Sequence, residues 1–247
     1  MLPADFYTGI VAQLYGPLKS HRPDPRTYAD FIREAGEPAL ELGCGDGDPL
    51  IELRRRGLEV EGVDSSADML AGCRRRAREE GIDVVVHHQR MEALDLPHRY
   101  GAIFLAGPTF TLLPDDATAL AALTGIAAHL VEGGTALVSV FVPEPTPAGQ
   151  LGQIRRATAD DGADLRVSVV SEERDETTRT QTTVLRYERH LDGISTVEDR
   201  PWLLHWYTRT GFESLAAAVG LRVVSVTDAD GNAAASDETD LRFRLRR

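Results

Sequence analysis

The sequence predicts an α/β fold: a doubly wound, mostly parallel seven-stranded sheet with a C-terminal antiparallel hairpin, and a small antiparallel sheet inserted into it. Three observations predict this fold. Apolar strand-like runs alternate with amphipathic segments between residues 39 and 142, which is typical of parallel strands joined by crossover helices. Segments rich in threonine and valine follow without a long helix between them, as is typical of antiparallel strands. A last helix and two strands complete the chain.

The first part of the chain is expected to be helical and then to alternate. Apolar residues recur at three- and four-residue steps over 4–18, and a second helix is expected at 27–35. A Gly-Glu-Pro break separates this helix from the first buried strand. Strands are expected at 39–43, 59–64, 83–87, 101–106 and 134–142, and helices at 48–57, 66–80 and 116–130.

A proline-rich segment, 143–147, ends this alternation. Antiparallel strands are expected at 166–172, 180–191 and 194–208, then a helix at 210–219 and strands at 221–227 and 240–246. The chain therefore divides into three parts. These are residues 1–148 with the N-terminal helices and the core, 149–209 as an insertion over the active site, and 210–247 with the final helix and strands of the core.

Composition excludes several classes of protein. The 247 residues are 42% hydrophobic, enough for one large core. A net charge of -12 repels phosphate backbones, which argues against a nucleic-acid partner, and the arginine runs 54–56 and 74–76 are interpreted as solvated helix faces. No apolar stretch approaches the roughly 20 residues that span a membrane. Two cysteines and a start without a secretory pattern predict a cytoplasmic protein.

The most informative segment is Glu-Leu-Gly-Cys-Gly-Asp-Gly at residues 41–47, which follows a buried strand and opens a helix. Alternate glycines allow a tight turn and let a ligand approach the backbone closely. The carboxyl end of the first strand is where open parallel sheets bind ligands. The next strand ends at Asp64, where a carboxylate can accept the hydroxyl hydrogens of a ribose. This combination predicts a nucleoside site.

A dinucleotide-dependent oxidoreductase is the first alternative, because its G-x-G-x-x-G motif begins in the same way. Gly43 and Gly45 fit that motif, but Asp48 stands at the position of the third glycine and Gly47 comes one residue early. The carboxylates of Asp46 and Asp48 would also repel a pyrophosphate. A ligand without phosphates therefore fits better.

At these residues the chain resembles the class I S-adenosylmethionine-dependent methyltransferases, whose first motif is an acidic residue followed by G-x-G-x-G. The resemblance covers residues 36–143 and extends more loosely to both ends. It implies a Rossmann-like methyltransferase fold and S-adenosylmethionine as cofactor, with S-adenosylhomocysteine as product. The cofactor-binding residues that it implies are Tyr15, Glu41, Gly43, Cys44, Gly45, Gly47, Asp64, Ser65, Met69, Gln89, Arg90, Met91, Leu105 and Ala106.

The resemblance also implies a role for each group. Glu41 and the backbone of 43–47 would face the amino-acid part of the cofactor, Asp64 its ribose, and Ser65 and Met69 its adenosine.

Met91 occupies the apolar position that covers the adenine in this family, whereas Arg90 stands where aspartate is commonest, with Gln89 as a substitute. Leu105 and Ala106 would present main-chain atoms to the methionine end. Tyr7 and Tyr15 match aromatic positions over the cofactor, and Tyr15 is the better match. The departure at Arg90 leaves a second alternative open, a non-catalytic protein that binds S-adenosylmethionine.

Methyl transfer from a sulfonium is an in-line displacement that mainly requires correct orientation. An amine acceptor needs only to be neutral, so we expect N-methylation in preference to O-methylation. The adjacent His87 and His88 lack the spacing of metal ligands, which predicts a metal-independent reaction.

Period-two alternation over 202–209 places His205 and Tyr207 on one face of a strand, opposite Trp202 and Leu204. We expect His205 and Tyr207 to be catalytic residues that line the acceptor site, with His205 as base or proton carrier. A surface or subunit-contact strand is the alternative. The insertion after the fifth strand resembles that of bacterial small-molecule methyltransferases, which include N-methyltransferases of amino sugars and small amino acids. Several of these are dimeric through such an insertion, so the resemblance implies a small-molecule acceptor and a homodimer.

Overall fold

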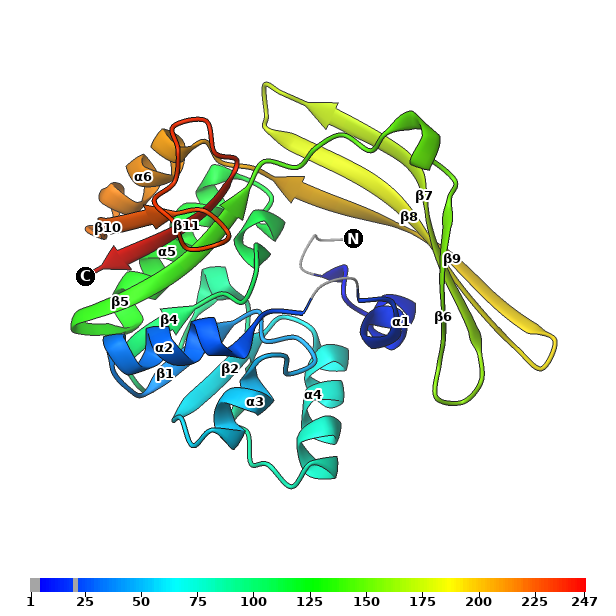
Figure 1. Cartoon of the computed structure of the whole chain (residues 1–247), viewed down its shortest axis with the longest axis horizontal. Coiled ribbons are helices and arrows are strands. Elements are labelled where there is room, and N and C mark those ends of the chain that lie inside the picture. Colours follow the sequence, from blue (N-terminus) through cyan, green and yellow to red (C-terminus); the bar gives the residue numbers. More distant parts are fainter. Residues whose placement is uncertain (1–4, 20–21) are drawn as a thin grey trace.

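The computed structural model describes residues 5–19 and 22–247 (Figure 1). Its main sheet contains β1 (Ala39–Leu42), β2 (Val60–Asp64), β3 (Val86–His88), β4 (Tyr100–Phe104), β5 (Leu130–Phe141), β10 (Arg222–Thr227) and β11 (Asp240–Arg246). These strands lie in the order β10-β11-β5-β4-β1-β2-β3. The pairs from β3 across to β5 are parallel, whereas β11 pairs antiparallel with both β5 and β10. The predicted fold class is confirmed, including the C-terminal hairpin.

Strand order changes direction between β1 and β4, because the chain runs outward from β1 to β3 and then returns to the other side of β1. The carboxyl ends of β1 and β4 therefore border a crevice at the edge of the sheet, the usual ligand position in open α/β folds.

Helices cover both faces of this sheet (Figure 1). The helices α2 (Pro25–Ala35), α3 (Leu50–Arg55) and α4 (Ala67–Glu79) bury one apolar cluster against it. The helices α5 (Asp116–His129) and α6 (Arg209–Ala218) bury a second cluster on the opposite face. Neighbouring residues of β4 show the alternation, since Phe104 belongs to the first cluster and Ile103 to the second. The core is thus two-sided, as parallel sheets require.

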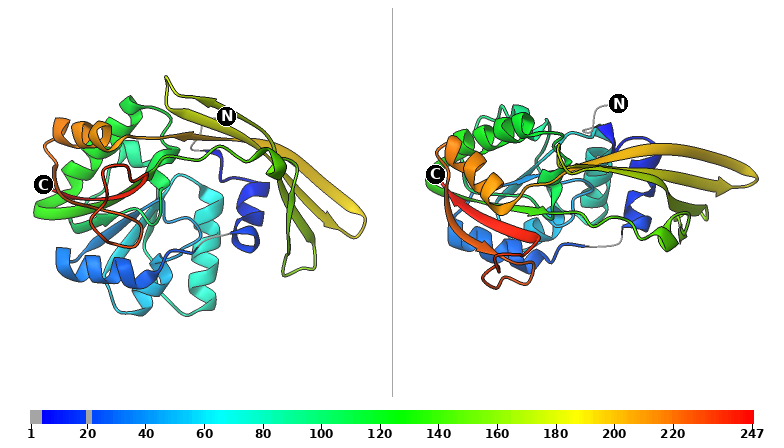
Figure 2. Two further views of the ribbon diagram at one scale, coloured as in Figure 1. Left: turned by 45° about the horizontal axis from the view of Figure 1, so that its top comes forward. Right: turned by 90° about the horizontal axis from the view of Figure 1, so that it is seen from above.

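A second sheet contains β6 (Ile154–Thr158), β7 (Asp164–Asp175), β8 (Thr180–Leu191) and β9 (Ile194–His205), all paired antiparallel in chain order. It projects to one side of the core (Figure 2). The sequence did not predict β6, because its side chains are mostly exposed and show no apolar alternation. The last strand ends at His205, three residues earlier than expected, before Thr208 caps α6.

The N-terminal segment lies between the two sheets (Figure 1). Helix α1 (Ile10–Leu18) is shorter than the predicted 4–18, because Gly9 has a left-handed φ of 58° and the helix begins after it. Its apolar face packs on the inserted sheet, where Val11 and Leu14 share a cluster with Leu165 and Tyr187. Residue 4 lies outside the described residues.

Arg200 of β9 ties the segment before α1 to the inserted sheet. Its guanidinium donates to the Phe6 carbonyl at 3.2 Å and to the Thr8 hydroxyl at 3.0 Å. On the other side, the Ser66 hydroxyl donates to the Tyr7 carbonyl at 2.5 Å, and the Gly9 N–H donates to the Asp68 carboxylate at 2.7 Å. The segment before α1 is therefore hydrogen-bonded both to β9 of the inserted sheet and to the start of α4 in the core.

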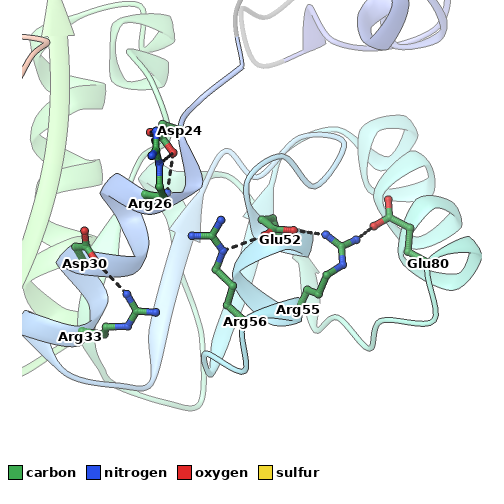
Figure 3. A network of polar contacts seen from close by, with 8 residues as sticks. All are labelled: Asp24, Arg26, Asp30, Arg33, Glu52, Arg55, Arg56 and Glu80. Carbon is green, nitrogen blue, oxygen red and sulfur yellow. Dashed lines mark hydrogen bonds and ion pairs between the residues drawn. The ribbon is translucent and has the colours of Figure 1, made fainter.

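Arg55, Arg56, Arg74 and Arg75 are exposed on helix faces, as expected, whereas Arg76 turns inward to the Asp46 carboxylate at 3.2 Å. Figure 3 shows Arg55 between Glu52 and Glu80, with Arg56 donating to Glu52 at 2.9 Å. Such exposed pairs contribute little to stability. Among the described residues, no helix combines the length and the apolar composition needed to cross a membrane.

Candidate cofactor and acceptor site

The glycine turn follows β1, whose four residues are all buried. Gly43 has a φ of 73°, and a Cβ there would lie 2.5 Å from Thr109 Cγ2. The absence of a side chain lets the 3-10 helix η3 (Thr109–Leu112) close over the turn. A Cβ at Gly47 would instead meet Cys73 Sγ of α4 at 2.8 Å. The missing side chain of Gly47 therefore allows close packing against α4, and the expected contact of its backbone with the cofactor stays a prediction.

Asp64 ends β2 and faces the turn. One carboxylate oxygen accepts the Gly45 N–H at 2.8 Å, and the other accepts the Ser66 N–H at 2.8 Å. Burial raises the pKa of Asp64 above its ordinary value, and donation from the two N–H groups opposes this effect. The carboxylate lies in the crevice, among the residues that line its narrower cavity. Its free lone pairs can accept further hydrogen bonds from a ligand.

Glu41 lies beneath the turn and is fully buried. Neither of its carboxylate oxygens has a hydrogen-bond partner within the described residues. Burial, reinforced by the nearby charge of Asp48, raises the pKa of Glu41 well above its ordinary value. Glu41 therefore does not line the cavity itself, but it is a buried acceptor without a donor, which a cationic ligand group such as an ammonium would satisfy.

A narrow cavity of about 110 Å³ lies beside the turn on the β2 side. It brings together five of the residues that the resemblance implies for the nucleoside: Asp64, Ser65, Met69, Gln89 and Met91. Tyr7 and Tyr15, expected over the cofactor, line it as well, and the structure adds Thr109, Leu112 and Glu92.

The sequence did not single out η3. Its position after β4, the strand next to β1 at the crevice, is the signal that could have found it.

Two expected side-chain contacts differ in the structure. Arg90 turns away from the cavity, toward the carboxylate of Asp5 at 3.4 Å. The Leu105 side chain is buried in the apolar cluster under α5 and α6, and the expected contact of its main chain stays a prediction. Gln89 lines the cavity, but its side-chain amide exchanges two hydrogen bonds of 2.9 Å with the backbone of Asp95. That amide is committed within the protein, so it is a poor substitute for the missing aspartate.

A larger cavity of about 690 Å³ adjoins the turn and extends to the inserted sheet. Both cavities share Tyr7, Tyr15, Gly43 and Gly45 in their lining, so they meet at the turn. Cys44 and Ala106 also line the larger one. Its far wall is contributed by β6 to β9 through residues that include Arg155, Val167, Leu185, Tyr187, Trp202 and Leu204.

The structure corrects the expectation for His205 and Tyr207. Trp202 and Leu204 line the cavity, whereas neither His205 nor Tyr207 is among the described residues that do so. His205 Nδ1 lies 2.9 Å from the Tyr207 hydroxyl, and the Tyr207 ring packs on Phe110 in the core. The face of β9 that carries His205 turns toward α5, where His205 Nε2 lies 3.6 Å from the Asp116 carboxylate, whereas Trp202 on the opposite face stacks on Phe6. Neither side chain lines the cavity, and their catalytic role stays a prediction that this arrangement does not support.

The adjacent histidines lie at the end of β3. His87 Nε2 is 2.7 Å from a Glu61 carboxylate oxygen, and His88 Nε2 is 3.0 Å from the Ser65 carbonyl. Over residues 5–19 and 22–247, no group of three or more His, Cys, Asp or Glu side chains is arranged to hold a metal ion. The metal-independent reaction stays a prediction.

The raised pKa of Glu41 predicts a pH dependence of stability without ligand. Between pH 4.5, the ordinary pKa of a glutamate, and the raised pKa in the folded protein, Glu41 is deprotonated in the unfolded chain but protonated in the folded one. The free energy of unfolding therefore falls as pH rises through this interval. We expect Glu41→Gln to remove this part of the slope. Calorimetry should show the variant gaining more Tm at about pH 8 than at about pH 5. An equal change at both pH values, or the same gain in the exposed control Glu59→Gln, would contradict this.

Comparisons with known proteins agree with this geometry. Residues 39–134 match the model of a methyltransferase domain. The chain is 30% identical to dTDP-3-amino-3,6-dideoxy-alpha-D-glucopyranose N,N-dimethyltransferase from Streptomyces fradiae, over 90% of this chain and 87% of that protein. The fold is similar to an S-adenosylmethionine-dependent methyltransferase from Clostridium acetobutylicum, with a TM-score of 0.74 and 15% identity over 95% of this chain and 96% of the other.

The fold is also similar to S-adenosylmethionine-bound CalS10, an amino pentose methyltransferase from Micromonospora echinaspora, with a TM-score of 0.64 and 22% identity over 90% of this chain and 89% of the other. These matches set aside the oxidoreductase and the non-catalytic alternatives. The chain is similar to a known methyltransferase over nearly its whole length, and its crevice brings the glycine turn and Asp64 together. The protein is therefore an enzyme of the S-adenosylmethionine-dependent methyltransferase family.

Proposed function

We propose that this enzyme N-methylates the amino group of an amino-deoxy sugar carried on a nucleoside diphosphate. The observation that carries the proposal is the 30% identity to a dTDP-amino-sugar N,N-dimethyltransferase over 90% of the chain. The cavity of about 690 Å³ between the turn and the inserted sheet supports it, because this space can hold an acceptor beside the methyl donor.

In this proposal the cofactor spans both cavities. In the narrow cavity, Asp64 would accept hydrogen bonds from the ribose hydroxyls and Met91 would cover the adenine, since both residues line it. The amino-acid end of the cofactor lies along 43–45, with its ammonium near Glu41. The unpartnered carboxylate of Glu41 supports this placement, because a buried acceptor requires a donor.

The acceptor wall has an apolar and a polar part. Phe6 stacks on Trp202 with ring centres 6.2 Å apart and meets Tyr187 edge-on at 6.4 Å, and such rings suit the apolar face of a deoxy sugar. Arg155 lies on the same cavity from β6, with Gln150 and Gln153 beside it. A guanidinium is well suited to binding a diphosphate.

The cofactor supplies an electrophilic methyl group, which the neutral amine attacks as the bond to sulfur breaks. The protein residues hold the amine in line and exclude water. Burial raises the pKa of Tyr7 and Tyr15 far above the ordinary value and that of Tyr187 to about 12, so these hydroxyls stay protonated and can donate to the acceptor. No histidine is among the described residues that line the cavity.

The proposal includes a cytoplasmic homodimer formed through the inserted sheet. Large apolar side chains on its strands are exposed: Ile154 by 47%, Val170 by 43% and Val197 by 51%. Exposed apolar side chains gathered on one element are typical of an interface. Both cysteines are buried and unbridged, as expected in a reducing compartment.

Asp64→Asn tests the cofactor placement. Loss of the charged acceptor should weaken S-adenosylhomocysteine binding by about 10- to 100-fold, since hydrogen bonds to charged groups contribute about 1.5–3 kcal/mol. Titration calorimetry measures this, with circular dichroism to confirm folding. The exposed Asp30→Asn should bind like the wild type, and a change of less than about twofold for Asp64→Asn would remove its role.

The acceptor is tested with dTDP-3-amino-3,6-dideoxyglucose and S-adenosylmethionine. Mass spectrometry should show the addition of one or two methyl groups, and none to the analogue with a hydroxyl in place of the amine. Arg155→Met should raise KM for the nucleotide-linked sugar by about 10-fold or more, since it removes a charged contact. Arg156→Met, one residue away and outside the cavity lining, is the control. Failure to methylate any amino sugar nucleotide would reject the proposed acceptor.

Sedimentation velocity tests the dimer. The double variant Val170→Asp, Val197→Asp should sediment as a monomer, because charge in an apolar interface is costly. Val85→Asp changes an apolar residue that is 50% exposed on the core and should leave the dimer intact. A monomeric wild type, or a dimer unaffected by the double change, would contradict the proposed interface.

A further inference from the structure

Lys19 is the single lysine among the 27 lysine and arginine residues of the sequence. It directly follows α1, and its side chain is only 8% exposed. It lines the larger cavity together with Gly43 and Gly45 of the turn. A buried ammonium is costly unless it is paired, so its position beside the cofactor turn calls for a reason.

The ion pairs of Lys19 do not supply that reason. Its ammonium lies 3.2 Å from Asp48 and 3.5 Å from Asp46, longer than the 2.7–2.9 Å or so of strong charged hydrogen bonds. Each of these carboxylates has another cation: Arg76 lies 3.2 Å from Asp46, and Arg22 lies 3.8 Å from Asp48. Three cations therefore share two carboxylates, so the Lys19 ammonium can donate a further hydrogen bond to a ligand.

The cofactor brings both an ammonium and a carboxylate to this turn. Glu41 is the unpartnered acceptor that suits the ammonium. The carboxylate needs a cationic donor near 43–45. Among the described residues lining the cavity, Lys19 and Arg155 are the basic ones, and Arg155 lies on β6 of the inserted sheet.

We propose that Lys19 binds the carboxylate of the cofactor's amino-acid end and positions the methyl donor beneath α1. A lysine suits this place because its compact charge sits on a flexible stem, so it can keep one aspartate contact while donating to the ligand. Lys19 directly follows α1, and Val11 and Leu14 of this helix also line the acceptor cavity. Binding of the cofactor then also restrains α1, which forms part of the acceptor cavity.

The test is a cycle of two ligands and two proteins. S-adenosylhomocysteine carries the carboxylate, and 5′-deoxy-5′-(3-aminopropyl)thioadenosine lacks it but retains the amine. We expect Lys19→Met to weaken S-adenosylhomocysteine binding by about 10- to 100-fold in titration calorimetry. Binding of the decarboxylated ligand should stay within about twofold of the wild type. An equal loss for both ligands, or a loss for neither, would overturn the proposal.

Two controls separate this role from a structural one. Arg22→Met removes the exposed cation from the same Asp48 and should change neither affinity. Lys19→Arg keeps the charge and should restore most of the discrimination between the two ligands.

The single lysine also allows a direct spectroscopic readout in the unmutated protein. Reductive methylation with ¹³C labels Lys19 and the terminal amine, and the Lys19 resonance should shift with S-adenosylhomocysteine but much less with the decarboxylated ligand. Identical shifts with both ligands would contradict the contact. None of these measurements depends on the identity of the acceptor, so they stand or fall separately from the proposed amino-sugar activity.

Discussion

The site depends on the Asp64 carboxylate, which joins two loops that are separate in sequence. One oxygen holds the Gly45 N–H of the glycine turn, and the other holds the Ser66 N–H where α4 begins. Ser66 in turn caps α4 and donates to the Tyr7 carbonyl. One buried carboxylate therefore fixes the turn after β1, the start of α4 and the segment before α1. The same group faces the nucleoside cavity, so the site's geometry and its ligand preference share one physical cause.

A second constraint comes from the segment 5–18, which lies between the inserted sheet and the core and contacts both. Arg200 holds its backbone from the inserted sheet, while Asp68 and Ser66 hold it from the core. The apolar face of α1 packs on β7 and β8 through Val167 and Tyr187. The larger cavity lies where this segment, the turn and the inserted sheet meet. The inserted sheet thus forms the acceptor site only with α1 in place.

The charges around the turn suit a cationic ligand without phosphates. Lys19, Arg22 and Arg76 pair with Asp46 and Asp48 at the turn. Glu41 has no hydrogen-bond partner among the described residues, and its burial raises its pKa. A cationic ligand group satisfies this carboxyl group, whereas a pyrophosphate does not.

The sequence by itself determined the sheet, the glycine turn and Asp64, because alternation, glycine spacing and the end of a buried strand are local patterns. It located most of the residues around the nucleoside cavity for the same reason, since these follow consecutive strands. Only the tertiary structure decided which face of β9 meets the cavity. A period of two separates the face of Trp202 from the face of His205, but it does not say which face lies inside. Stacking of Trp202 on Phe6, a residue far earlier in the chain, places that face toward the cavity. The edge strand β6, the closure of η3 over Gly43 and the inward course of Lys19 likewise depend on contacts between distant segments, which no local pattern encodes.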